Sequence, residues 1–366
     1  ELAALAFQKS MPLKTLDARH LFNALFSLLG LVGVYRLGTL LGGSPTGLLA
    51  AAMLLLVPRW VGHSFNNPKD IPFAVACVWT LEQVVRSIDP ERNLSRRRKW
   101  LLGISLGLTS AIRVAGVYLG AVWVCLSAYA LARRARQDGS WWIRSRRLFA
   151  DVVTVSAIAY ASALPFWPLL VDSPVSGPIE ALTVFSSFKE VHISFFEGEH
   201  VRSRDVPRRY APKWLLLTLP EHILAALALF LIIALKRRFL SIQIAAVILA
   251  MAVPLVYAIA MRGVFYDGIR HLIFLIPPMT LIGAIATTEA LKHRESRLRW
   301  LAYGVVGLLV FPGIWNVIRL HPNQVVYFNR MITGGIGKAS ERYATDYWRN
   351  SYKQGLDWID ANVEPK

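Results

Sequence analysis

The sequence predicts an all-α integral membrane protein, a polytopic helical bundle with about ten membrane-spanning helices. The chain has 366 residues, of which 55% are hydrophobic, and its mean hydropathy is +0.43. Soluble domains rarely have such a composition. Apolar runs of about 18–22 residues recur along the chain, and this is the length that an α-helix needs to cross a bilayer. The runs do not alternate with a period of two, so an outer-membrane β-barrel is disfavoured.

Ten apolar segments meet the length criterion for spanning helices. They cover residues 21–41, 46–61, 73–88, 99–112, 115–132, 148–171, 221–238, 241–261, 271–290 and 299–319. Two of them are the weakest candidates, because the segment 73–88 carries Glu82 and Arg86 and the segment 99–112 is short. The count is therefore least certain between residues 73 and 112.

Clusters of basic residues between the apolar runs indicate the orientation of the chain. They lie at residues 92–99, 133–147, 236–238 and 292–299. With ten alternating spans all four clusters fall on one side, which the positive-inside rule makes cytoplasmic. The outer side then holds the loops 62–72, 172–220 and 262–270. Topology explains most of the net charge of +18, so nucleic acid is not an expected partner.

The chain divides into two parts by composition. Residues 1–319 carry all the apolar runs and form the predicted membrane domain. Residues 320–366 are not membrane-like and read as the start of an exoplasmic C-terminal segment. The polar, aromatic-rich stretches all lie on the outer side, so chemistry is expected there and a cytosolic nucleotide substrate is not.

The segment 62–73 is the first candidate site, because it places a dense polar cluster between two apolar runs. It contains His63, Asn66, Asn67, Lys69 and Asp70, and the prolines at 68 and 72 disfavour a continuous helix. Polar groups next to lipid are costly unless they serve a purpose. Asp70 is the candidate catalytic residue, as a general base, and its neighbours are candidate substrate ligands. The alternatives are a solvated turn and a helix N-cap at Asp70.

A second group of candidate donor-binding residues is basic and aromatic. Arg113 stands alone between two spans, where an arginine can hold a phosphate through two hydrogen bonds or simply extend to the membrane interface. The segment 266–271 packs Tyr266, Asp267, Arg270 and His271 into six residues before a span. A cation there could stabilise charge on a departing phosphate, and interface anchoring is again the alternative.

The long loop 172–220 contributes candidate contacts to an acceptor or to lipid. Its run of basic and aromatic residues suits a membrane interface or a lipid phosphate, and it contains Arg208, Arg209, Tyr210 and Lys213. Glu197, Glu199 and His200 lie close together in the sequence, but their spacing fits no specific metal motif. No metal site is predicted, and a divalent cation as cofactor is left open.

Three segments carry a resemblance to a known family. Residues 66–73, 266–271 and 321–329, the last with His321 and Tyr327, resemble segments of the C-type (GT-C) membrane glycosyltransferases. Within these, the chain is similar to bacterial relatives of protein O-mannosyltransferases and of lipid A aminoarabinose transferase (glycosyltransferase family 39-like). The stretch from Gly107 to Arg113 resembles the glycine-rich helix of the family, which ends in a basic residue. The layout agrees over nearly the whole chain.

The resemblance implies an activity. Such enzymes transfer a hexose or pentose, with inversion, from a polyprenyl-phosphate carrier to an acceptor protein, lipid or glycan. A carboxylate acts as the base, and Arg or Lys stabilises the phosphate leaving group. The reaction occurs at the extracytoplasmic face of the bacterial inner (plasma) membrane. Asp70 matches the acidic residue of the second outer loop in the family, and His321 and Tyr327 become candidate acceptor or lipid contacts.

One departure from the family pattern affects the assignment of the base. The family has an essential acid just after its first span, and residues 1–20 contain no such motif. We therefore expect an N-terminally truncated sequence, with about eleven spans in the full-length protein. In that case the base lies outside this sequence, and Asp70 is its helper or a ligand of a metal or of the substrate.

Two other classes of function compete with the enzyme. A membrane transporter or flippase for a lipid-linked or anionic substrate would place its polar groups near the bilayer midplane, on broken helices. A scaffold with an exoplasmic interaction domain would have no reason to bring polar residues together. The enzyme requires Asp70, Arg113 and Arg270 to converge on one outer cavity with an opening that faces the lipid.

Overall fold

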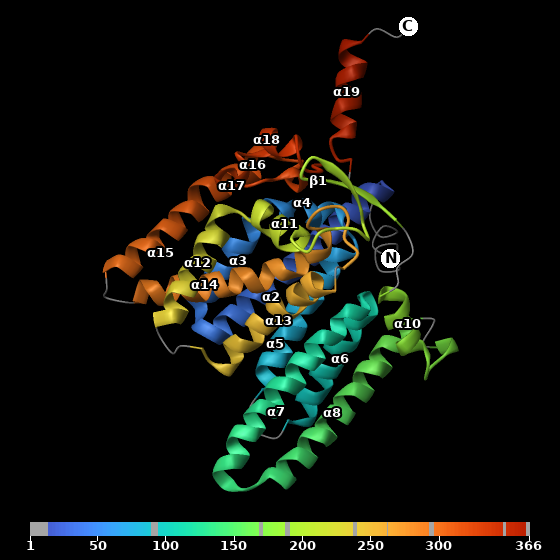
Figure 1. The fold of residues 1–366 in the computed structure, drawn as a ribbon, viewed down its shortest axis with the longest axis vertical. Helices are drawn as coiled ribbons and strands as arrows, with labels where there is room; N and C mark the ends of the chain where they lie inside the picture. The colour runs from blue at the N-terminus through green and yellow to red at the C-terminus, as the bar shows by residue number, and fades with distance from the viewer. Residues whose placement is uncertain are drawn as a thin grey trace.

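The structure is a computed structural model that describes residues 14–88, 94–167, 171–186, 191–236, 240–261, 263–292, 296–346 and 349–363. It is a bundle of helices with one small hairpin (Figure 1). The first half of the chain forms α2 (Thr15–Gly42), α3 (Ser44–Leu55), α4 (Pro58–Asn66), α5 (Asp70–Ser87), α6 (Arg96–Ile112), η1 (Val114–Val117), α7 (Tyr118–Asp138), α8 (Trp141–Ala163) and η2 (Leu164–Phe166).

The second half adds the hairpin and the remaining helices. Its elements are α10 (Gly177–Ser186), β1 (Ile193–Phe196), β2 (Glu199–Arg202), α11 (Tyr210–Thr218), α12 (Glu221–Lys236), α13 (Ile242–Ala260), η3 (Arg270–Leu275), α14 (Ile276–Lys292), α15 (Ser296–Leu308), the π-helical turn η4 (Leu309–Gly313), α16 (Ile314–Arg319), η5 (Gln324–Val326), α17 (Arg330–Thr333), α18 (Ile336–Ser340) and α19 (Tyr352–Asn362). The antiparallel strands β1 and β2 pair Ile193 with Arg202 and Phe196 with Glu199. The all-α membrane bundle is therefore confirmed.

The predicted count of ten spans is not confirmed. Among the described residues, six helices are long and apolar enough to cross a membrane, or eight if each of two bent pairs is one span. The weak segments 73–88 and 99–112 do form helices, α5 and α6, but charged residues and short length keep them out of that count. The segment 46–61 is not one helix: α3 and α4 meet at an angle of 68°, because Pro58 cannot continue the helix before it.

The expected outer loops contain more regular structure than the sequence indicated. Residues 62–66 belong to the end of α4 and residues 70–72 to the start of α5, so only residues 67–69 connect them. Within 172–220 the described residues form α10, the β1–β2 hairpin and α11. Residues 263–269 are irregular, as expected for a loop.

A buried ion-pair cluster explains how α5 carries charge within the bundle. The Glu82 side chain is fully buried. Arg36 of α2 donates from Nη2 to Glu82 Oε1 at 2.9 Å and from Nε to Oε2 at 3.2 Å, and Arg86 donates to Oε1 at 2.9 Å. A buried carboxylate is tolerated when cations and hydrogen bonds surround it, so Glu82 joins α2 to α5.

Replacing Glu82 by glutamine is expected to destabilise the fold by roughly 1–3 kcal/mol, because two arginines then share a site without a carboxylate. Thermal unfolding in detergent, followed by circular dichroism, measures the change. Glu289→Gln is the control, since Glu289 is partly exposed and its ion pair with Lys292 spans 3.7 Å. An equal shift in both variants would contradict a special role for Glu82.

Helices α6, α7 and α8 pack as a slanted group beside the rest of the bundle (Figure 1). Two glycines of α6 explain how closely α8 approaches it. A Cβ atom at Gly103 would lie 2.6 Å from Ile158 Cγ2, and one at Gly107 would lie 2.2 Å from the Ala159 carbonyl oxygen. The glycine-rich character of this helix thus serves helix packing.

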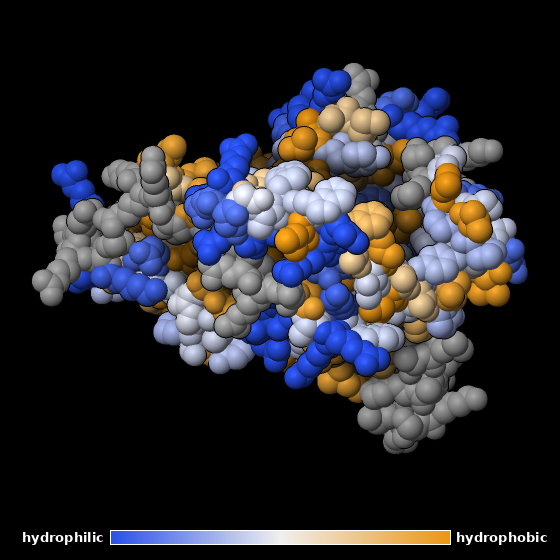
Figure 2. All heavy atoms as spheres, turned by 90° about the horizontal axis from the view of Figure 1, so that it is seen from below, coloured by the Kyte–Doolittle hydropathy of each residue, from blue (hydrophilic) through white to orange (hydrophobic). Residues whose placement is uncertain are grey.

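Hydrophilic residues are spread between hydrophobic patches over the lower end of the molecule (Figure 2).

Candidate functional site

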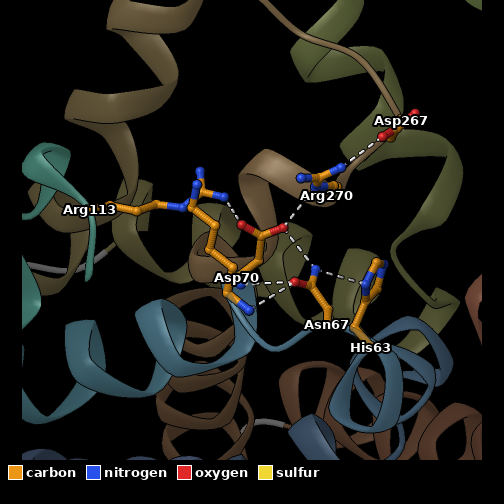
Figure 3. A network of polar contacts seen from close by, with 7 residues as sticks. His63, Asn67, Asp70, Arg113, Asp267 and Arg270 are labelled. Atoms are coloured by element: carbon orange, nitrogen blue, oxygen red, sulfur yellow. Dashed lines mark hydrogen bonds and ion pairs between the residues drawn. The ribbon is translucent and has the colours of Figure 1, made fainter. Parts of the chain in front are cut away.

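Asp70 is the first residue of α5, and its carboxylate does not cap that helix. Asn67 supplies the cap, because its Oδ1 accepts a hydrogen bond from the Asp70 amide at 2.9 Å. The Asn67 Nδ2 also donates to Asp70 Oδ2 at 2.8 Å. The Asp70 carboxylate is thereby turned toward side chains from other parts of the chain (Figure 3).

Two arginines far apart in the sequence converge on this carboxylate. Arg113 forms an ion pair through Nη2 with Asp70 Oδ1, and Arg270 donates from Nε to Oδ2 at 3.1 Å. Asp70 is only 3% exposed. The structure therefore brings together, at one buried point, the three residues that the enzyme hypothesis requires (Figure 3).

Arg113 is placed by the end of α6. The helix ends at Ile112, and Arg113 is extended, with φ −147° and ψ 128°, before η1 begins. Its guanidinium lies over the ring of Phe73, 5.7 Å from the centroid. Burial, and then the nearby Arg270, lower the pKa of Arg113 to about 10, so the side chain is protonated at neutral pH.

Arg270 is placed by a tight turn before η3. Asp267 and Gly268 both adopt left-handed backbone conformations, with φ of +56° and +66°, which aspartate and glycine accept more readily than most residues. Asp267 Oδ2 accepts from Arg270 Nη1 at 2.8 Å. The guanidinium also lies 5.3 Å from the centroid of the Tyr266 ring. Two carboxylates and one aromatic ring thus orient Arg270.

The segments flanking the hairpin support this turn. His192 stacks on Tyr266, with ring centroids 4.1 Å apart, and the His271 ring meets Tyr266 edge-on at 4.6 Å. The Phe265 amide donates to the Ser203 carbonyl oxygen at 3.3 Å. Arg270 is therefore held by contacts from both sides of the turn.

The charges of the cluster favour an anion. Lys69, Arg113 and Arg270 carry three positive charges, and Asp70 and Asp267 carry two negative ones. Burial, followed by Arg113 and Arg270, lowers the pKa of Lys69, which is the sign expected when cations crowd together. An anionic ligand would relieve this repulsion.

Two residues of the polar segment behave differently. His63 is fully buried, and its Nδ1 lies 3.2 Å from Asn67 Nδ2, so it lies behind the Asn67–Asp70 pair. Asn66 donates to the Gly62 carbonyl oxygen of its own helix at 3.1 Å. His63 thus contacts the network around Asp70, and no hydrogen bond joins Asn66 to it.

The other candidate residues lie in separate contacts. Arg209 and Lys213 both pair with Glu197 in the hairpin turn, and Arg208 is exposed. Tyr210 is buried against Phe196 and Trp214.

The C-terminal candidates also bond elsewhere. The His321 Nδ1 lies 3.2 Å from Gln324 Nε2, and the Tyr327 hydroxyl donates to Glu221 Oε2 at 2.9 Å. None of these contacts includes Asp70, Arg113 or Arg270.

The sequence interpretation did not single out two buried polar residues that shape the site. Asn23 of α2 donates to the carbonyl oxygens of His63 at 3.3 Å and Ser64 at 2.7 Å, which fixes α4 against α2. Arg59 is fully buried, donates from Nε to the Tyr327 carbonyl oxygen at 2.8 Å and lies 5.0 Å from the Phe328 ring centroid. A polar residue inside an apolar run was the available signal in both cases.

Among the described residues, no group of three His, Cys, Asp or Glu side chains is placed to hold a metal ion. Of Glu197, Glu199 and His200, which lie close together in the sequence, Glu197 is engaged with a cation, because its Oε2 accepts a hydrogen bond from Arg209 Nη2 at 2.7 Å.

An apolar groove begins next to Arg113. It has a volume of about 460 Å³ and lies between α6, α7 and α8. Its lining includes Val114, the residue after Arg113, Val117 at the end of η1, and Gly120 and Trp123 of α7. The groove thus leads away from the charged cluster along helices of the membrane domain.

The comparisons with known proteins agree with the resemblance seen in the sequence. Residues 10–167 match the family model described as dolichyl-phosphate-mannose-protein mannosyltransferase. A search of curated proteins found no match.

Several solved structures have a similar fold. ArnT from Cupriavidus metallidurans bound to undecaprenyl phosphate is 15% identical, with a TM-score of 0.55 over 84% of this chain and 51% of that one. Its apo state is 18% identical, with a TM-score of 0.56 over 88% and 53%. The archaeal oligosaccharyltransferase AglB from Archaeoglobus fulgidus, in complex with an inhibitory peptide and a dolichol-phosphate, is 15% identical, with a TM-score of 0.51 over 99% and 49%.

These findings confirm the fold of the C-type membrane glycosyltransferases and an integral membrane protein. The chain spans about half the length of the solved structures it matches.

Proposed function

We propose that this chain, with the fold of a C-type membrane glycosyltransferase, transfers a sugar from a polyprenyl-phosphate carrier to an acceptor outside the cytoplasm. The observation that carries the proposal is the convergence of Arg113 and Arg270 on the buried Asp70. Two guanidinium groups that flank one carboxylate (Figure 3) suit a phosphate, which each can bind through paired hydrogen bonds.

The reaction requires positive charge at the phosphate. The acceptor oxygen forms a bond to the anomeric carbon as the bond from that carbon to the phosphate oxygen breaks, with inversion. The acceptor gives up a proton, and the carrier phosphodiester becomes a phosphate monoester with additional negative charge. Arg113 and Arg270 are placed to stabilise the charge that develops on the leaving group.

We assign Asp70 a positioning role, which is the helper role left open by the sequence. Its carboxylate already accepts from Asn67 and pairs with both arginines, so taking the acceptor proton would break contacts that hold the phosphate ligands in place. Inverting transfer then needs a base other than Asp70.

The carrier lipid would occupy the groove between α6, α7 and α8. An isoprenoid chain is apolar, and the groove is lined mainly by apolar side chains that begin directly after Arg113. Two of the similar structures contain a polyprenyl-type phosphate, undecaprenyl phosphate in ArnT and dolichol-phosphate in AglB. The family description favours mannose as the sugar, and the acceptor is a protein, lipid or glycan.

A transfer assay tests the proposal directly. Purified full-length protein in lipid nanodiscs is incubated with polyprenyl-phosphate mannose and, separately, with other polyprenyl-phosphate hexoses and pentoses, together with a membrane extract as the acceptor source. Release of polyprenyl phosphate that depends on the acceptor extract, with glycosylated product seen by mass spectrometry, is expected. Absence of release from every donor would contradict the proposal.

Replacing Gly120 by leucine is expected to raise the KM for the polyprenyl-phosphate donor about tenfold, because the new side chain enters the apolar groove. Each CH2 group of the carrier lipid that is buried in the groove contributes about 0.8 kcal/mol to binding. A leucine at position 120 would exclude several of these groups from the groove. The change is compatible with the fold, since the nearest atom to an added Cβ is Leu106 Cδ2 at 3.7 Å and leucine favours helix over glycine.

Gly307→Leu in α15 is the matched control. It makes the same change in a helix where an added Cβ meets nothing within 4 Å, and Gly307 does not line the groove beside Arg113. Its donor KM should equal that of the unmodified protein. Equal KM values for Gly120→Leu and Gly307→Leu would place the carrier chain elsewhere.

The transporter or flippase remains the second candidate because two spans are broken. The pair α3–α4 bends by 68° and the pair α11–α12 by 114°, and broken helices are frequent in transporters. A flux assay with fluorescent polyprenyl-phosphate sugar in liposomes separates the two functions, since a transporter moves the intact donor and a transferase consumes it.

A further inference from the structure

A polar cavity lies near the C-terminal end of α16, apart from the cluster around Asp70. It has a volume of about 250 Å³. Two exposed arginines, Arg319 and Arg330, contribute to its lining together with the glycine-rich turn at residues 334–337. Neither arginine forms an ion pair with a residue that the structure describes.

Asn316 gives this cavity a buried polar wall. The residue is only 8% exposed and lines the cavity, and its side chain makes no hydrogen bond to any described residue. Its amide is therefore available to a ligand in the cavity. Arg319 and Arg330 line the same cavity, and an amide together with two guanidinium groups suits an anionic ligand with several acceptor oxygens.

One carboxylate that bonds to residues of the cavity lining, Glu221, is already engaged. Glu221 Oε2 accepts from the Tyr327 hydroxyl at 2.9 Å, and Oε1 accepts from the Arg330 backbone amide at 2.8 Å. Glu221 therefore fixes the cavity wall through its two oxygens and pairs with neither guanidinium.

An apolar groove lies further along the same helices. It has a volume of about 340 Å³ between α12 and α15, and its lining includes Leu229 and Ile232 of α12 and Gly304 and Leu308 of α15. An added Cβ at Gly304 would meet no atom within 4 Å, so the groove is open at that point.

Both helices lead from the groove to the polar cavity. The run α15–η4–α16 is a single candidate span, Arg297–Arg319. Leu308 lines the groove and Asn316 lines the cavity. The eight residue steps between them cover about 12 Å at the helical rise. On the other side, α12 begins at Glu221, which bonds to two residues of the cavity wall, and Ala225, one turn later, lines the groove. An anion site and an apolar groove are thus aligned along one membrane span.

We propose that this surface binds an anionic glycerophospholipid. Its phosphate lies between Arg319 and Arg330, where guanidinium forks match phosphate oxygens, and the Asn316 amide donates to it. One acyl chain lies in the groove beside Gly304. The site is separate from the donor groove, which is formed by α6, α7 and α8.

This lipid site lies at the same end of the bundle as the candidate active site. Helix α4, which carries His63, contacts both η5 and α16, and Arg59 of α4 donates to the carbonyl oxygen of Tyr327, a residue of the cavity lining. Helix α4 therefore contacts elements of both sites.

Native mass spectrometry tests the proposal. The full chain in detergent is titrated with phosphatidylglycerol, and separately with phosphatidylcholine, and lipid adducts are counted. Preferential binding of at least one phosphatidylglycerol is expected. Arg319→Gln and Arg330→Gln should each weaken it about fivefold, the effect of one cation at an anionic lipid surface. Arg342→Gln, an exposed arginine of the C-terminal segment that does not line the cavity, should have no effect.

Two further arms identify the parts of the ligand. Gly304→Leu should weaken phosphatidylglycerol binding, and Gly307→Leu on the same helix should not. Inorganic phosphate should compete only weakly, because it lacks an acyl chain; full competition by phosphate would identify a free-phosphate site and overturn the lipid assignment. Equal binding of the two lipids, or unchanged binding in both arginine variants, would also overturn it. These readouts do not depend on sugar transfer, so they stand apart from the proposed function.

Discussion

Asp70→Asn is expected to lower sugar transfer about 100-fold or more, which is the scale seen when one preorganised electrostatic group is lost from an active site. Asparagine keeps the shape of the side chain but removes the charge that holds Arg113 and Arg270. The two guanidinium groups would then repel each other and separate. Transfer kinetics with a polyprenyl-phosphate sugar measure the effect, and the rise in donor KM should accompany the fall in kcat.

The same substitution is expected to destabilise the fold, because removing one partner of a buried ion pair costs about 3–5 kcal/mol. Activity must therefore be measured well below the melting temperature of the variant. Asp70→Glu keeps the charge and should recover part of the transfer. Asp267→Asn is the matched control: Asp267 holds the same Arg270 but its side chain is 32% exposed, so the loss should be much smaller. Near-normal transfer by Asp70→Asn would leave the segment 62–73 without a role in transfer.

Arg270→Lys is expected to reduce kcat about 10- to 100-fold, and Arg270→Ala by more. The arginine donates from Nε to Asp70 and from Nη1 to Asp267, and a single ammonium group cannot reproduce this planar, two-sided geometry. Stabilisation of the leaving phosphate should therefore be lost even though the charge is kept. Single-turnover release of polyprenyl phosphate measures the chemical step.

The control for charge and surface effects is Arg209→Lys. Arg209 also pairs with a carboxylate, Glu197, but its side chain is 65% exposed and lies in the hairpin contact. Its replacement should leave transfer unchanged. Wild-type turnover by Arg270→Ala would exclude the phosphate role for this residue. Arg113→Lys should behave like Arg270→Lys, since both arginines pair with the same carboxylate.

Local sequence pattern was sufficient to identify the class of fold and the segments that meet at Asp70. Long apolar runs predict membrane helices because a bilayer leaves backbone groups no other partners, and the helices are present. Asp70, Arg113 and Arg270 stood out because they lie between apolar runs on the predicted outer side, apart from the basic clusters that topology explains. The same reasoning did not settle the number of spans, because Pro58 breaks one run and Glu82 is accommodated inside the bundle by Arg36 and Arg86.

Only the tertiary structure decided what these residues contact. A carboxylate at a helix start can cap that helix or bind distant cations, and the sequence cannot choose, because both use the same local pattern. In the fold Asn67 takes the cap, and 200 residues of chain separate Asp70 from the arginine that bonds to it. The packing of α5 against α6 and η3 creates that meeting. Likewise, Arg208, Arg209 and Lys213 look like further phosphate ligands in sequence, but the hairpin places Glu197 beside two of them. Long-range contacts of this kind depend on which helix faces meet, and no local pattern encodes that choice.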